Sequence, residues 1–117
     1  MCSSDLSMRR SGAGTIHHVA FRAPTPEDQA AWRKRLAEIG MEVTPVIDRQ
    51  YFDAIYFRTP GGVLFEIATD PPGFATDEEA ESLGEALKLP PQYEAHRAQI
   101  EAVLPKLTLP ERRRTAP

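Results

Sequence analysis

The stretch FDAIYFRTPGGVLFEIAT, residues 52–69, decides the fold of this chain. It holds two runs, 52–59 and 63–69, that are rich in β-branched and aromatic residues, and only residues 60–62 separate them. Runs of this composition favour β-strands. A connection this short, built from Pro and Gly, is typical of a tight turn between antiparallel strands. The stretch therefore predicts an antiparallel hairpin.

The segment GTIHHVAFRAP, residues 14–24, predicts another strand over residues 15–23, which Pro24 ends. The segment after it, up to Gly40, carries the signals of a helix. Thr25 is a suitable N-cap, Pro26 suits the first helical position, and Gly40 suits the C-cap. Three apolar residues at helical spacing predict the buried stripe of this helix: Trp32, Leu36 and Ile39.

Residues 41–49 predict the remaining strand, and Pro45 indicates that this strand lies at a sheet edge or carries a bulge. The order is therefore β-α-β-β-β, an α+β fold, and further helices are expected over residues 77–87 and 90–104. We accordingly divide the chain into a disordered leader or cloning scar (1–12), a βαβββ module (13–75), a helical segment (76–108) and a frayed tail (109–117).

Composition narrows the class of protein. The chain has 117 residues, 41% of them hydrophobic, and a net charge of -3, which argues against a nucleic-acid-binding protein. Its apolar runs are far shorter than the ~20 residues that a membrane-spanning helix needs, so no membrane partner is expected. A single cysteine, Cys2, allows no disulfide within the chain and fits a reducing, cytoplasmic location.

Side chains alternate between the two faces of a strand, so residue parity predicts which of them lie together. The side expected to face the helix is made of apolar residues: Val19, Phe21, Ile55, Phe57, Val63, Phe65 and Ile67. Parity places His17 on this side too. The opposite face carries His18, Tyr56, Arg58 and Glu66. A histidine, a carboxylate and a phenol on one sheet face are a chemical constellation rather than a core.

Glu66 is the least expected residue of this face, because its neighbours in VLFEIA are apolar and an unpaired buried carboxylate is costly. One interpretation is that the face is exposed to solvent, with Glu66 an ordinary polar position and His18 a satisfied strand histidine. The other is a metal site. An imidazole and a carboxylate together suit Fe(II), Mn(II) or Zn(II), as in the two-histidine-one-carboxylate triad.

The segments HHVAFR and VTPVIDRQYFDAIYFRTPGGVLFEIATDPPGF, with a helix between them, resemble the vicinal-oxygen-chelate superfamily of glyoxalases, bleomycin-resistance proteins and extradiol dioxygenases. The run PVIDRQYFDAIYFR and the tail LKLPPQYE resemble more narrowly the C-terminal module of hydroquinone-type ring-cleaving dioxygenases. The resemblance covers roughly residues 14–105. It implies an oxidoreductase that opens hydroquinone or catechol-like rings with O2, using Fe(II) or Mn(II) held by two histidines and one glutamate.

The resemblance also implies roles for single residues. His18 and Glu66 match metal ligands. Arg49 matches a basic residue that stabilises an anionic substrate oxygen, Tyr56 a phenol that hydrogen-bonds substrate or oxygen, and His17 an acid-base or orienting histidine.

Each of these three roles has a structural alternative. Arg49 could instead pair with Asp48 or Asp53 at a strand end, and the Tyr56 hydroxyl could lie in water. For His17 the alternative is a structural role, because parity places it away from His18.

The third metal ligand has no match in this chain, since His96 follows no family motif. We expect it from an N-terminal module of a longer protein or from a second copy of the chain, and we favour the fragment. The isolated chain is then expected to be inactive. Two other functions stay open: a glyoxalase-type isomerase or lyase built as a homodimer, and a non-catalytic module that binds aromatic ligands, as bleomycin-resistance proteins do.

Overall fold

The computed structural model describes residues 12–108. The chain forms two compact units, Met1–Gly73 and Phe74–Pro117. The predicted leader, except for Gly12, and the predicted tail, 109–117, lie outside the described residues.

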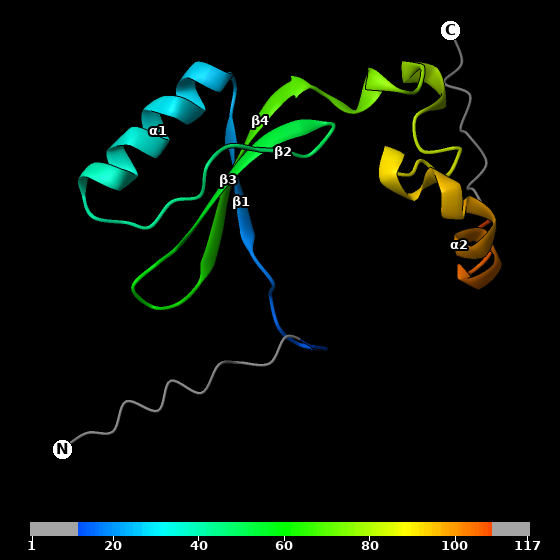
Figure 1. The fold of residues 1–117 in the computed structure, drawn as a ribbon, viewed down its shortest axis with the longest axis horizontal. Helices are drawn as coiled ribbons and strands as arrows, with labels where there is room; N and C mark the ends of the chain where they lie inside the picture. Colours follow the sequence, from blue (N-terminus) through cyan, green and yellow to red (C-terminus); the bar gives the residue numbers. More distant parts are fainter. Residues whose placement is uncertain (1–11, 109–117) are drawn as a thin grey trace, which may run out of the picture. The chain divides into compact units, whose positions relative to one another are not determined.

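The first unit is a four-stranded sheet with one helix on it (Figure 1). Its elements follow the predicted β-α-β-β-β order, which confirms the α+β fold: β1 (Val19–Ala23), α1 (Pro26–Glu38), β2 (Ile47–Asp48), β3 (Phe52–Arg58) and β4 (Leu64–Pro72). In space the strands stand in the order β1-β4-β3-β2. β1 runs parallel to β4, and the other neighbouring strands are antiparallel. The sheet therefore has β4 and β3 at its centre.

The predicted hairpin is confirmed as β3 and β4, with Tyr56 opposite Glu66. Its turn is closed by a hydrogen bond from Gly62 N to Thr59 O, 2.8 Å long, and Gly62 has a φ of 82°. That left-handed backbone favours glycine. The strand predicted over residues 41–49 is shorter than expected: beyond β2, Val43 makes only an isolated bridge to Phe57. Pro45 has no N–H to give to a ladder, which explains the interruption.

Helix α1 begins at the predicted N-cap, and its C-cap lies one residue before the predicted Gly40. Thr25 is the N-cap, its side chain accepts a 3.1 Å hydrogen bond from Asp28 N, and Pro26 opens the helix. Ile39 is the C-cap, and Gly40 follows it at a φ of 82° with its N–H bonded to Ala37 O. Gly40 thus takes the left-handed position that commonly ends a helix.

The core lies between α1 and the sheet: Ala23, Leu36, Ile55, Phe57 and Ile67, with Met41, Val43 and Phe65 packed against them. The predicted stripe of α1 was partly wrong. Leu36 is buried, but Trp32 is 49% and Ile39 69% exposed. An α-helix turns by ~100° per residue, so Trp32 and Ile39 point roughly 60° to one side of the direction in which α1 faces the sheet.

Gln29 is the other residue of α1 that faces the sheet. Because it is polar, a search for regularly spaced apolar residues could not find it. Its side chain is buried, and its Nε2 donates to Asp53 O and Ile67 O, both at 2.8 Å. One amide thereby ties α1 to the two central strands.

The predicted apolar face of the sheet is only half covered. Val19, Phe21 and Val63 were expected under the helix, but all three are exposed. The buried members come from the central strands β3 and β4. Val19 and Phe21 lie on the edge strand β1, and Val63 precedes β4, so α1 does not cover them.

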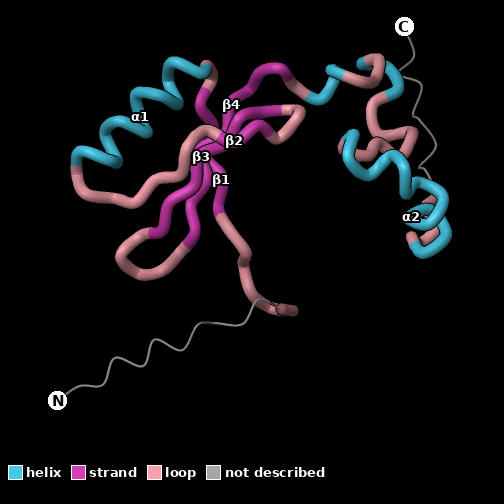
Figure 2. The backbone as a smooth tube through the Cα atoms, viewed as in Figure 1, coloured by secondary structure: helices cyan, strands magenta, loops and turns pink. Residues whose placement is uncertain are grey.

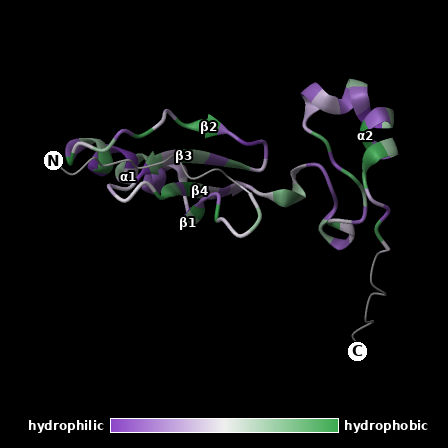
Figure 3. Ribbon diagram, turned by 90° about the horizontal axis from the view of Figure 1, so that it is seen from below, coloured by the Kyte–Doolittle hydropathy of each residue, from purple (hydrophilic) through white to green (hydrophobic). Residues whose placement is uncertain are grey.

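The second unit is built from short helices (Figure 2). Three are 3-10 turns, η1 (Phe74–Thr76), η2 (Ala80–Ser82) and η3 (Pro91–His96), and the last is α2 (Arg97–Val103). The helix predicted over 90–104 is present as η3 followed by α2, with polar and apolar positions alternating along α2 (Figure 3).

The helix predicted over 77–87 was wrong, since only Ala80–Ser82 is helical there. Its acidic residues stand three and four positions apart, where like charges destabilise a helix, and Gly84 adopts a φ of 79°. Among residues 12–108, no helix combines the length and apolar character that crossing a bilayer requires.

Candidate metal and substrate site

Glu66 lies at the centre of the sheet face opposite α1. It belongs to β4, with Ala20 of β1 beside it on one side and Tyr56 of β3 on the other. Only 3% of its surface is exposed, so the interpretation of Glu66 as an ordinary exposed position is wrong. A buried carboxylate needs partners to offset its lost hydration. The structure supplies two.

The first partner is His18, which stands just before β1. Its Nε2 lies 2.8 Å from Oε2 of Glu66, and its side chain is 38% exposed. One edge of the imidazole therefore faces the buried carboxylate while the ring stays accessible from solvent.

The second partner is Tyr56, whose hydroxyl donates a 3.0 Å hydrogen bond to Oε1 of Glu66. Burial raises the pKa of Tyr56 above its ordinary value, and the bond to Glu66 adds to this effect against the opposing influence of Arg49. The phenol therefore stays protonated at neutral pH and remains a donor. The alternative of a Tyr56 hydroxyl lying in water is wrong.

Arg49 extends the network by one step. Its Nε donates to the Tyr56 hydroxyl at 3.2 Å, and its guanidinium carbon lies 5.3 Å from the centre of the Tyr56 ring. Within residues 12–108, Arg49 forms no ion pair with Asp48 or Asp53, so that alternative is not what the structure shows. Its positive charge is held over the phenol instead.

His17 lies closer to the site than strand parity predicts. Its Nδ1 is 2.9 Å from Nδ1 of His18, and the two ring centres are 5.1 Å apart in an edge-to-face arrangement. The expectation that His17 points away from His18 was wrong, because β1 begins only at Val19 and residues before it need not alternate. One ring must donate to the other, and this contact fixes complementary tautomers for the pair.

All five predicted site residues thus form one continuous network, from His17 through His18, Glu66 and Tyr56 to Arg49. Sequence reasoning missed a further polar pair on this face, Arg22 and Asp70. Arg22 and Asp70 have even residue numbers, as Glu66 has, and alternate residues of a strand share a face. This alternation is the signal that could have found the pair.

The donor set suits a divalent metal ion. Two ligands at ~2.1 Å from one ion and at right angles to each other stand roughly 3 Å apart. The 2.8 Å between Nε2 of His18 and Oε2 of Glu66 matches this spacing. Among residues 12–108, no group of three histidine, cysteine or acidic side chains could hold a metal ion. His18 and Glu66 are thus the pair of neighbouring donors that this face offers to an ion.

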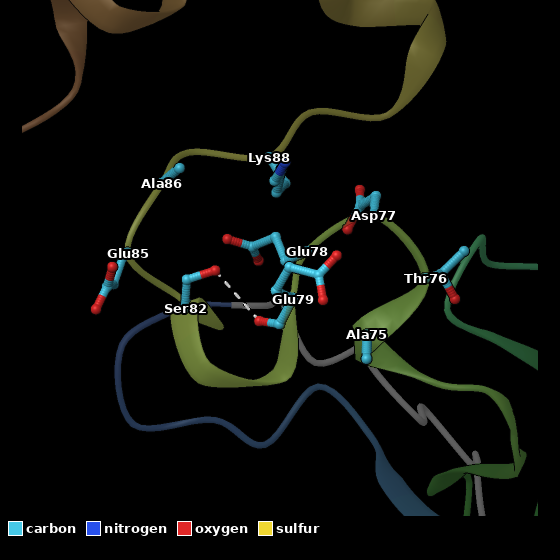
Figure 4. Close-up of a pocket in the computed structure, with 9 residues that line it drawn as sticks. All are labelled: Ala75, Thr76, Asp77, Glu78, Glu79, Ser82, Glu85, Ala86 and Lys88. Carbon is cyan, nitrogen blue, oxygen red and sulfur yellow. Dashed lines mark hydrogen bonds between the residues drawn. The ribbon is translucent and has the colours of Figure 1, made fainter.

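The second unit has a hollow of its own, with a volume of about 450 Å³ (Figure 4). Acidic side chains dominate its lining: Asp77, Glu78, Glu79 and Glu85, with Lys88 as the basic residue. Gly84 N donates to Glu78 and the Ser82 hydroxyl to Glu79 O.

Comparison with known proteins places this geometry in a family. The profile described as "Glyoxalase/Bleomycin resistance protein/Dioxygenase superfamily" matches residues 5–67, a span that contains both His18 and Glu66. A crystal structure titled as a putative dioxygenase from Bacillus subtilis strain 168 superposes with a TM-score of 0.77 at 59% identity. It covers 84% of this chain, and the match takes up 32% of that protein.

Two curated relatives carry dioxygenase names. The chain is 63% identical over 90 residues to "Putative ring-cleaving dioxygenase MhqO" of Bacillus subtilis, which covers 77% of this chain and 29% of that protein. It is 41% identical over 92 residues to "Chlorohydroquinone/hydroquinone 1,2-dioxygenase" of Sphingobium indicum, which covers 76% of this chain and 28% of that protein.

The chain thus spans less than a third of the length of these relatives. The fold and the profile match agree, however, over the βαβββ unit that carries the site. The chain belongs to the glyoxalase/bleomycin resistance protein/dioxygenase superfamily.

Proposed function

We propose that this chain supplies the carboxylate half of the active site of a metal-dependent, extradiol-type ring-cleaving dioxygenase, which opens hydroquinone or catechol-like rings with O2. The observation that carries the proposal is the buried Glu66, which has His18 2.8 Å from one oxygen and Tyr56 3.0 Å from the other. The names of relatives at 41–63% identity support the reaction class.

In this proposal His18 and Glu66 hold Fe(II), with Mn(II) as the alternative ion of similar ligand preference. The bound ion would supply Lewis-acid and redox chemistry toward the aromatic diol and O2. A ferrous site and a single cysteine, Cys2, fit a reducing compartment, so we also propose a cytoplasmic location.

The third ligand has to come from outside residues 12–108, because these residues hold no group of three ligands. We propose that it belongs to another module of a longer protein. The support is that the relatives are more than three times as long as their match to this chain. A second copy of the chain is the other possible source, but it would bring two histidines and two glutamates rather than a triad.

The remaining residues of the network are proposed to act on protons and charge. Tyr56 donates to Glu66, holds that carboxylate in place and presents its hydroxyl toward the substrate. Arg49 places a positive charge beside the phenol, where an anionic substrate oxygen would be stabilised. His17 fixes the tautomer of His18 through the contact between their Nδ1 atoms.

Oxygen uptake tests the proposal. The protein should be assembled with the module that supplies the third ligand, loaded anaerobically with Fe(II) and mixed with hydroquinone or catechol in a closed cell. We expect ring-opened product and one O2 consumed per ring, and loss of both in Glu66→Gln. Aromatic binding without O2 uptake, unchanged by a chelator or by Glu66→Ala, would contradict the proposal and point to a sequestering module. Isomerase or lyase activity of a metal-loaded dimer of this chain would contradict it in favour of the glyoxalase type.

A further inference from the structure

An ion pair between Arg22 and Asp70 lies on the same sheet face as Glu66. Nε of Arg22 donates to both carboxylate oxygens of Asp70, at 2.9 and 3.0 Å, and its Nη2 donates to Oδ2 at 2.6 Å. In the β1–β4 register Ala20 stands beside Glu66, and Arg22 stands beside Ala68. Because every second residue of a strand shares a face, the ion pair and the metal-site residues belong to one surface.

Two residues with small side chains accompany Glu66 and the ion pair on this face. Ala20 on β1 stands beside Glu66 and Ala68 on β4 stands beside Arg22, and we call these two alanines the alanine shelf. Ala20 is exposed and Ala68 partly so. Along β1, Arg22 stands two residues or ~7 Å beyond the level of Glu66, and along β4, Asp70 stands four residues or ~13 Å beyond it. An aromatic ring with an oxygen at each end is of a length that falls within this range.

The ion pair has hydrogen-bonding capacity left. The Arg22 side chain is 71% exposed, and its Nη1 makes no hydrogen bond to any described residue. The Asp70 side chain is 44% exposed, and each of its oxygens has lone pairs beyond those that Arg22 uses. A phenolic hydroxyl both donates and accepts, and the pair offers an acceptor and a donor side by side.

We propose that Arg22 and Asp70 bind the distal oxygen of a para-dihydroxylated ring that lies across the alanine shelf, with its other oxygen at the His18–Glu66 end. This inference rests on the proposed function and adds to it a selectivity of the site for para-diols over catechols. The two oxygens of a para-diol stand at opposite ends of the ring, so one molecule spans both sites. The two oxygens of a catechol are neighbours and reach only one of them.

Ligand binding under anaerobic conditions tests the inference without turnover. Hydroquinone, catechol and phenol, which has a single oxygen, are titrated into the iron-loaded protein, assembled with the module that supplies the third ligand. The variants are Arg22→Gln and Asp70→Asn, and the control is Lys34→Gln, which removes another exposed ion pair, with Glu38 on α1. We expect both site variants to bind hydroquinone at least about tenfold more weakly, the measure of one lost charge-assisted hydrogen bond. Their affinity for phenol and catechol should match that of the control.

A second variant, Ala68→Val, raises the floor of the shelf while keeping a residue that suits a strand. It should weaken all three ligands and leave the iron content unchanged. The inference is overturned if hydroquinone affinity is unchanged in Arg22→Gln, or if hydroquinone and phenol affinities fall equally, which would mark the ion pair as a tie between β1 and β4 only.

The inference and the proposed function fail in different ways. A wild-type protein that cleaves catechol but shows no Arg22-dependent preference for hydroquinone keeps the dioxygenase proposal and overturns the inference. A wild-type protein that binds hydroquinone with this dependence but consumes no O2 supports the inference and overturns the dioxygenase proposal.

Discussion

The hydroxyl of Tyr56 donates to Oε1 of Glu66, and the other oxygen of that carboxylate, Oε2, faces His18. The two strands that carry Tyr56 and Glu66 are paired with these residues directly opposite each other. The carboxylate is therefore held from both sides, which is the preorganisation that the metal-ligating role proposed for Glu66 needs.

Replacing Tyr56 by phenylalanine removes only the hydroxyl that holds Glu66. We expect Tyr56→Phe to keep most of its iron but to lose about 10–100-fold in kcat/KM toward hydroquinone, the usual effect of removing a group that orients a metal ligand. The measurements are iron content and steady-state O2 uptake. Tyr93→Phe, at an exposed tyrosine of the second unit, is the control. A Tyr56→Phe protein with wild-type kinetics would show that the hydroxyl plays no part.

Arg49 touches Tyr56, and its contribution is expected to depend on that contact. A double-mutant cycle with Arg49→Gln and Tyr56→Phe measures the dependence. If Arg49 acts through the phenol, the double variant should be about as slow as the slower single variant. Effects that multiply would show instead that Arg49 reaches the substrate independently.

Gln29 is expected to matter for stability rather than for chemistry. Gln29→Ala removes two hydrogen bonds to the carbonyls of Asp53 and Ile67 and leaves these acceptors without the amide. We expect a loss of ~2 kcal/mol in the free energy of unfolding, measured by chemical denaturation. Gln99→Ala, at an exposed position of α2, should change it by less than about 0.5 kcal/mol. Equal effects of the two variants would contradict the role of Gln29 as a tie between helix and sheet.

The ion pair of Arg22 and Asp70 makes a pH-dependent contribution. Arg22 lowers the pKa of the Asp70 carboxyl in the folded protein, so the pair stabilises the fold above the unfolded value of ~3.9, and this stability is lost as the pH falls through the folded pKa. The difference in unfolding midpoint between wild type and Asp70→Asn should therefore be present at pH 6 and vanish in strong acid. A difference that grows on acidification would contradict this sign.

Local sequence signals predicted much of the fold. The Pro-Gly turn before Val63, the cap at Thr25 and the glycine at position 40 each depend on neighbouring residues alone, and the structure contains all three features. Strand alternation also placed Tyr56 and Glu66 on one face, because every second residue of their strands points the same way. His18, the residue before β1, reaches that face as predicted and contacts Glu66.

What the sequence could not predict depends on tertiary contacts. Trp32 is apolar at helical spacing, but the line of α1 that faces the sheet passes through Gln29 and Leu36. His17 lies beside His18 because β1 starts only at the next residue, Val19. The exact start of β1 follows from its pairing with β4. The acidic residues 77–87 include helix-forming residues, yet η2 is the only helical element within that range.

The central claim is that His18 and Glu66 bind the catalytic metal, and metal stoichiometry tests it most directly. In the protein assembled with the module that supplies the third ligand, iron bound per protein after anaerobic loading and desalting is compared for wild type, His18→Asn, Glu66→Gln and the control Lys34→Gln, with circular dichroism to verify folding. We predict close to one iron in wild type and control and nearly none in the two ligand variants. Folded His18→Asn and Glu66→Gln proteins that retain a full equivalent of iron would contradict the claim.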